Sequence, residues 1–150
     1  MYKRILVPVD GSETSNLAVQ AALGLARESG GRVRFMHFFD VMAYMTGYEF
    51  SADVLDQAQA SARKTVDEAV AVAKAAGVEA DGKLLDVPGR RLGEAVADEA
   101  RLFEADLVAV GTHGRRGIGR VLLGSGAEEV IRFAPVPVLA VRAPQPPAAS

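Results

Sequence analysis

The sequence has 150 residues and no cysteine, 49% of its residues are hydrophobic and 24% are charged. This length suits one domain with a continuous apolar core, and the composition is that of an ordinary globular protein. The lack of cysteine excludes disulfides, thiol catalysis and zinc–thiolate sites. A formal net charge of −2 gives no general attraction to nucleic acid or to an anionic membrane, so we expect neither as a partner.

The amino-terminal stretch MYKRILVPVD has too short an apolar run for a signal peptide. No stretch approaches the roughly twenty apolar residues of a membrane span. We therefore expect a cytoplasmic protein.

The first half of the chain alternates between buried strands and amphipathic helices. The run KRILVPV at 3–9 predicts a strand that stops at Asp10-Gly11. Apolar residues spaced by three and four then predict a helix that Gly30-Gly31 ends, and RVRFMHFF at 32–39 predicts a second strand. Helical spacing resumes over 54–76 and is closed by Gly77.

The second half repeats this alternation. A third strand, interrupted by Gly82, is expected within 78–87, and a third helix over 92–103. ADLVAVGT at 105–112 predicts a strong fourth strand, 127–134 a short fourth helix and 136–142 a fifth strand. The proline-rich residues 143–150 are expected to be a disordered tail, which leaves a single domain over 1–142.

Strands alternating with helices predict an α/β fold, a three-layer α/β/α sandwich with a five-stranded, mainly parallel sheet. In such sheets ligands bind beyond the carboxyl ends of the strands, where the strand order reverses. The segments that follow strands are therefore the ones to examine: 10–11, 38–51, 86–91 and 111–125.

The segment from Gly111 to Ser125 is rich in glycine, which lets backbone amides approach a phosphate closely. The first turn of the helix after it attracts anions. Three arginines would add positive charge: Arg115, Arg116 and Arg120. The alternative is a long connection without a ligand, in which Ser125-x-x-Glu128 is a capping box and the arginines are solvated.

The spacing of glycines within this segment distinguishes between known phosphate-binding motifs. A P-loop requires a lysine, and none follows Lys83; a Rossmann fingerprint requires a third glycine that is missing here. The sequence instead matches G-x2-G-x9-G-[ST], with Gly111, Gly114 and Gly124-Ser125. This spacing resembles the nucleotide-binding motif of the ATP-binding branch of the universal stress protein family. The likeness extends over residues 2–142 and includes ILVPVDGS, the histidine of FMHFF, ADLVAVGTHGRRGIGRVLLGS and APVPVLAV.

The resemblance implies a Rossmann-like, adenine-nucleotide α-hydrolase-like sheet with strand order 3-2-1-4-5. It also implies binding of ATP, or of AMP or ADP, with Mg²⁺ held by the phosphates and not by protein side chains. The residues it implies for the nucleotide are Pro8, Val9, Asp10, Phe38, Val110, Gly111, Gly114, Gly124, Ser125, Gly126 and Ala127. Two of these depart from the family pattern, because Gly126 stands where a β-branched residue is frequent and Phe38 where valine is frequent.

The resemblance further implies a homodimer through the edge strand 136–142, and a regulatory role in stress adaptation with at most slow ATP hydrolysis. The alternative within the family is a dimeric interaction module that binds no nucleotide. Asp10 and Ser12 are also candidates to cap the first helix. His37 is expected to be a satisfied core histidine, and His113 would contact a phosphate or solvent. The side chains of segment 40–52 either pack back onto the second helix or form a lid over the base or a partner surface.

Two other classes fit poorly. A phosphorelay receiver needs an acidic pair after the first strand and a lysine after the fifth, and both are missing. An adenylating enzyme would carry SGGxDS or HIGH signatures, and neither occurs.

Overall fold

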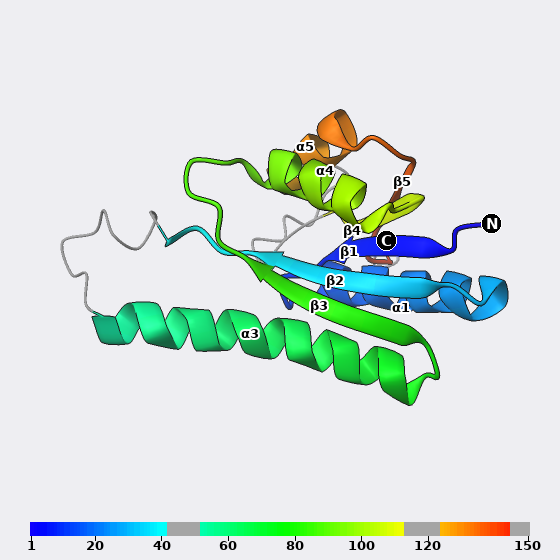
Figure 1. Ribbon diagram of the computed structural model, residues 1–150, viewed down its shortest axis with the longest axis horizontal. Helices are drawn as coiled ribbons and strands as arrows, with labels where there is room; N and C mark the ends of the chain where they lie inside the picture. The colour runs from blue at the N-terminus through cyan, green and yellow to red at the C-terminus, as the bar shows by residue number, and fades with distance from the viewer. Residues whose placement is uncertain (42–51, 113–123, 145–150) are drawn as a thin grey trace, which may run out of the picture.

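The computed structural model describes residues 1–41, 52–112 and 124–144. Within these ranges, strands and helices alternate from the amino terminus onward, as the periodicities predict (Figure 1). The strands are β1 (Arg4–Pro8), β2 (Arg32–Phe38), β3 (Glu79–Leu85), β4 (Leu107–Gly111) and β5 (Val138–Val141). The helices are α1 (Glu13–Ser29), α3 (Ala52–Ala75), α4 (Leu92–Phe103) and α5 (Ser125–Phe133).

The five strands form one sheet in the order β3-β2-β1-β4-β5, which confirms the predicted order. All four neighbouring pairs are parallel. The chain therefore adds β2 and β3 on one side of β1 and crosses to the other side for β4 and β5. The strand order reverses between β1 and β4, and the carboxyl ends of these two strands lie next to each other.

Helices cover both faces of the sheet, which confirms the three-layer sandwich. Helices α1 and α3 lie on one face, and α4 and α5 on the other (Figure 1). The strands alternate accordingly: Ile5 and Val7 pack with α1, whereas Leu6 packs with α4. Each face has its own fully buried aromatic anchor, Phe35 on the α1 face and Phe103 on the α4 face. Burying a side chain of this size contributes about 2–3 kcal/mol.

The predicted helix ends are close to those observed. Helix α1 begins after Ser12, whose side chain accepts a hydrogen bond from the backbone of Ser15, and ends at Gly30, which adopts a left-handed conformation with φ of 71°. Helix α5 begins at Ser125, two residues before the predicted start at 127. None of the described helices is long and apolar enough to cross a membrane.

Candidate functional site

Asp10 leaves the carboxyl end of β1 and is fixed at the start of α1. Its backbone N–H donates to Ser15 Oγ at 3.1 Å. Its carboxylate Oδ1 accepts the backbone N–H of Ser12 at 2.9 Å. Because Ser12 is the N-cap of α1, capping belongs to Ser12, while Asp10 shapes the turn that leads into the helix. The Asp10 carboxylate therefore lies at the edge where the strand order reverses.

Gly111 ends β4 directly against the first turn of α1. A Cβ placed on Gly111 would lie 2.6 Å from the carbonyl carbon of Thr14 and 2.8 Å from the backbone nitrogen of Ser15. These are backbone atoms, so no change of side-chain rotamer can relieve the close contact. Glycine is thus required here by packing between β4 and α1, whatever else the position contacts.

Gly124 joins the start of α5 to the end of β4. Its backbone N–H donates to the carbonyl oxygen of Thr112 at 2.6 Å. Two of the three motif positions, Gly111 and Gly124, are therefore brought together, although twelve residues separate them in the sequence. Gly124 is also the N-cap of α5 and supplies no side-chain hydrogen bond. The predicted capping box is wrong, because Ser125 already lies inside the first turn and cannot cap it.

The first turn of α5 contains Ser125, Gly126 and Ala127. The first amides of an α-helix have no acceptor within the helix, and they carry the positive end of its dipole. Gly126 packs near α4, since a Cβ there would lie 3.0 Å from Leu92 Cδ2. The amides of this turn therefore attract anions at this edge.

Thr112 is a residue that the sequence interpretation missed. It is only 2% exposed, and its Oγ1 has no hydrogen-bond partner within the described residues. An unpaired buried hydroxyl costs about 1–3 kcal/mol, so a structure retains one when it serves another purpose. Its position between Gly111 and Gly124 places this hydroxyl inside the motif. A threonine in a glycine-rich loop carries no sequence signal that distinguishes it from a solvated one.

The remaining predicted positions lie at the carboxyl ends of β1, β2 and β4. Strand alternation places Pro8, Phe38 and Val110 on the face that α4 and α5 cover. Val9 points to the other face, where it is 5% exposed and packs in the core. Its N–H donates to the carbonyl of Met36 at 2.8 Å, which ties the end of β1 to β2.

His37 is half-buried, and its Nδ1 lies 2.7 Å from the carbonyl oxygen of Val9. Because a carbonyl can only accept, Nδ1 carries the proton, and the prediction of a satisfied histidine is confirmed. His37 and Asp10 also line a pocket of about 230 Å³ that α3 closes from the side with Ala58, Ser61, Ala62 and Thr65. This pocket lies beside the strand ends.

Within the described ranges, no three His, Asp or Glu side chains gather in a way that would hold a metal ion. A divalent ion at this edge would therefore take ligands from a bound anion. Several predicted features lie outside the described residues: Gly114, His113, the three arginines of the loop, most of the 40–52 segment and residues 145–150.

Comparison with known proteins gives one consistent family. The model of the universal stress protein family matches residues 1–142. A universal stress protein of Methanocaldococcus jannaschii is 32% identical over 97% of this chain and 85% of its own length. One from Thermus aquaticus is 34% identical over 95% of this chain and its whole length.

Solved structures agree with these relatives. A protein from the universal stress protein family of Burkholderia pseudomallei has a TM-score of 0.76 and 30% identity, with 95% of this chain and 97% of that chain covered. A universal stress protein of Archaeoglobus fulgidus in complex with dAMP has a TM-score of 0.70 and 26% identity, with coverage of 93% and 98%. A universal stress protein in complex with cAMP has a TM-score of 0.69 and 27% identity, with coverage of 94% and 97%.

Proposed function

We propose that this chain, which belongs to the universal stress protein family, binds ATP or a related adenine nucleotide with Mg²⁺. The nucleotide binds at the carboxyl edge of β1 and β4. It acts as a regulatory protein of stress adaptation in the cytoplasm. The domain comprises residues 1–142, with the proline-rich tail outside it. The dAMP and cAMP complexes of two structural neighbours support the adenine nucleotide as ligand class.

The observation that carries the proposal is the junction of Thr112 and Gly124. The hydrogen bond between them joins the end of β4 to the first turn of α5. The unpaired Thr112 hydroxyl adds a buried polar atom at the same point. Helix-turn amides and a hydroxyl are the groups that hold phosphate oxygens elsewhere in proteins. The residues at this edge therefore fit a nucleotide phosphate.

The predicted residues then divide between the parts of the nucleotide. The amides of Ser125, Gly126 and Ala127 hold phosphate oxygens, and Gly114 and Gly124 belong to the same phosphate motif. Asp10 at the end of β1 accepts from the ribose hydroxyls beside Val110 and Gly111, while Pro8, Val9 and Phe38 border the base. Magnesium bound with the nucleotide would neutralise part of the phosphate charge.

Hydrolysis is at most slow in this proposal. Rapid phosphoryl transfer uses a phosphate-bound lysine and a residue that positions the attacking water. The motif contains no lysine, because none follows Lys83 in the chain. Binding without rapid turnover suits a regulatory protein whose nucleotide state is its signal.

We further propose a homodimer that forms through the edge strand β5. This strand is the last in the sheet order, so one side of its backbone has no neighbouring strand among those the structure describes. Nearby on α5, Ile131 and Phe133 are 44% and 36% exposed. A second copy would pair with the free strand edge and cover apolar surface at the same time.

The substitution Thr112→Val tests the nucleotide proposal because it separates binding from stability. Valine keeps the shape and removes a buried hydroxyl that has no partner, so the free energy of unfolding should stay level or rise by up to about 1 kcal/mol. Calorimetric titration with MgATP should show affinity about tenfold weaker than that of the wild type, which equals about 1.4 kcal/mol.

The matched control is Ser29→Ala, which removes a hydroxyl at the opposite edge, where Ser29 Oγ donates to the carbonyl of Tyr2 at 3.0 Å. This variant should bind MgATP like the wild type. If the wild-type protein gives no binding heat at millimolar nucleotide, the non-binding interaction module replaces the proposal. If Thr112→Val binds as tightly as Ser29→Ala, the hydroxyl has no part in the site.

A further inference from the structure

Two arginines lie side by side at the amino edge of the sheet, at the opposite end from the candidate nucleotide site. Arg4 begins β1 and Arg32 begins β2, and the register pairs these two residues directly. Paired residues on neighbouring strands share a face and lie about 5 Å apart, so both guanidinium groups point to the face of α4. Like charges in this arrangement destabilise a sheet unless counter-charges accompany them.

The neighbouring arginine, Arg34, is fully compensated. Two of its nitrogens donate to the carboxylate of Asp81, each at 2.9 Å, and a third donates to Glu99 at 2.9 Å. The Glu99 side chain is 2% exposed and also pairs with Lys83 at 3.0 Å. This network closes on itself and leaves no charge for a ligand.

Arg4 has no such carboxylate. Its Nε donates to the carbonyl of Phe103 at 2.7 Å, and its guanidinium stacks on the Phe103 ring at 4.7 Å from the centroid. Asp106 is near, but its two oxygens accept the backbone N–H groups of Lys3 and Arg4, at 2.7 and 3.1 Å. Within the described part of the chain, the terminal nitrogens of Arg4 therefore have no anionic partner.

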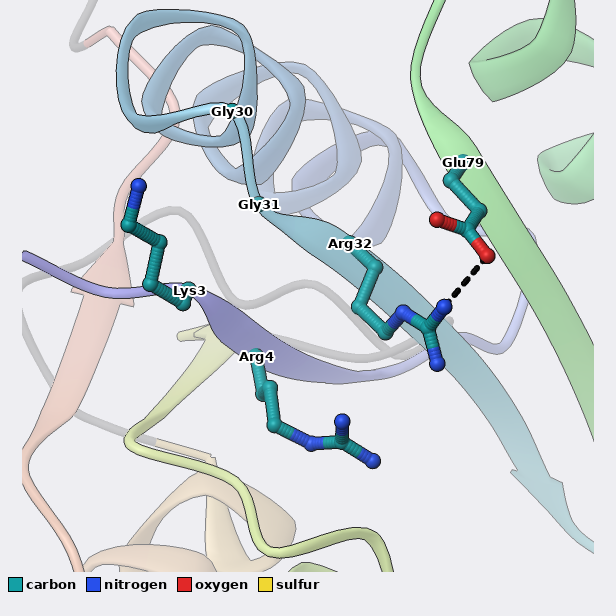
Figure 2. A pocket seen from close by; sticks show the side chains of 6 residues that line it. All are labelled: Lys3, Arg4, Gly30, Gly31, Arg32 and Glu79. Carbon is teal, nitrogen blue, oxygen red and sulfur yellow. Dashed lines mark hydrogen bonds and ion pairs between the residues drawn. The ribbon is translucent and has the colours of Figure 1, made fainter.

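Arg32 is only partly compensated. Its side chain forms an ion pair with Glu79, which is 70% exposed, and one terminal nitrogen makes the contact. Lys3 extends instead toward the end of α1, where its Nζ donates to the carbonyl of Ser29. Figure 2 shows the Arg4 and Arg32 guanidinium groups on the same side of the strands, with Lys3 directed away from them. The edge thus holds three cations and a single exposed carboxylate in its pocket lining.

These cations line a pocket of about 350 Å³ together with Gly30, Gly31 and Glu79 (Figure 2). We propose that this pocket binds a phosphate group, with the terminal nitrogens of Arg4 and Arg32 donating to its oxygens. A dianion with several acceptor oxygens suits two adjacent guanidinium groups better than a monocarboxylate, because it neutralises both charges and accepts from both planar donors. Free inorganic phosphate and a phosphate monoester share this chemistry. This site is independent of the proposed nucleotide site.

Amide-resolved NMR titration tests the proposal and locates the site. The full chain is titrated with inorganic phosphate, and separately with glycerol phosphate, at a constant ionic strength of about 0.15 M, with and without saturating MgATP. Shifts should concentrate at residues 3–4, 30–32 and 79 and should persist in the presence of MgATP. The stronger of the two titrants identifies the phosphate source. Chloride at equal ionic strength serves as the control and should leave these amides unmoved.

Three variants should change phosphate affinity in three different ways. Glu79→Gln removes the competing carboxylate and should tighten phosphate binding about threefold, whereas Arg4→Gln should weaken it about tenfold. Arg132→Gln removes an exposed charge from α5 and should change nothing.

The proposal is overturned if phosphate shifts only residues 9–12 and 110–127, if chloride produces the same shifts, or if Glu79→Gln weakens binding. Because MgATP reports on the other edge of the sheet, the two proposals succeed or fail separately.

Discussion

The contact between Gly111 and α1 makes the sharpest stability prediction. Gly111→Ala adds one methyl group 2.6 Å from the carbonyl carbon and 2.7 Å from the carbonyl oxygen of Thr14. Both atoms belong to the backbone, so relief requires α1 to move away from β4. Overpacking of this kind costs about 1–3 kcal/mol, less the few tenths gained from a stiffer unfolded chain. We expect a net loss of about 0.5–2.5 kcal/mol.

Gly24→Ala is the matched control, because it makes the same chemical change in the middle of α1. A Cβ at Gly24 meets no atom within 4 Å, and the position is exposed. Alanine is favoured over glycine in a helix interior by about 0.8–1.0 kcal/mol, so this variant should be stabilised by that amount. The two substitutions should therefore change stability in opposite directions, and the two variants should differ by about 1.5–3.5 kcal/mol.

Urea denaturation followed by circular dichroism measures the free energy of unfolding of both variants and of the wild type. The comparison requires that the free energy falls with urea concentration at the same slope in all three proteins. Movement of α1 would also displace Asp10, which is tied to Ser15, so Gly111→Ala should weaken MgATP binding while Gly24→Ala leaves it unchanged. If Gly111→Ala is as stable as the wild type, α1 does not pack on β4 as the structure describes. Stabilisation by both variants would contradict the packing argument entirely.

Three further predictions concern other parts of the fold. Gly93→Ala should cost about 1–3 kcal/mol in urea denaturation, because its Cβ would lie 2.6 Å from the Glu129 carbonyl oxygen where α4 crosses α5; a neutral result would contradict that crossing. The hydrogen bond from Arg34, with a smaller contribution from its charge, lowers the pKa of Asp81 below its ordinary 3.8. The ionised Asp81 therefore stabilises the fold above pH 3.8, and this stabilisation is lost as the pH falls through the lowered pKa. The Asp81→Asn variant should therefore lose less stability than the wild type when the pH falls below about 4. The difference should be modest, because the Asp81 carboxylate is more than half exposed. An equal loss of stability in the two proteins would contradict this prediction. Sedimentation at micromolar concentration should give twice the monomer mass, and a single monomeric species would refute pairing through β5.

The sheet was predictable because local patterns decide it. Short apolar runs bounded by glycine and alternating with periodic helices permit few arrangements, and the resemblance implied the observed order. The start of α5 was placed less well. Ser125 has the chemistry of a cap, but Gly124 already bonds to Thr112 and takes the N-cap position, so the helix starts earlier. A tertiary hydrogen bond decided between two neighbouring residues that are both acceptable caps.

Parts of the candidate nucleotide site and of the arginine-lined pocket could not be predicted from the sequence. Gly111 is conspicuous in sequence as a motif glycine, yet its clash with Thr14 depends on how closely α1 crosses β4. Thr112 is buried where its backbone bonds to Val141 on β5 and to Gly124 before α5, which are distant from it in sequence. The pairing of Arg4 with Arg32 follows from strand register, because twenty-seven residues separate them in sequence. Contacts between elements, not composition, create these features.

Amide-resolved titration with MgATP tests the central claim most directly. The account predicts saturable shifts at residues 9–12, 110–112 and 124–127, with the largest changes in the first turn of α5. Nucleotide released from protein purified without added ligand should be an adenine nucleotide. Saturation with no shift at 124–127, or no shift at any amide with millimolar MgATP, would contradict a nucleotide site at this edge.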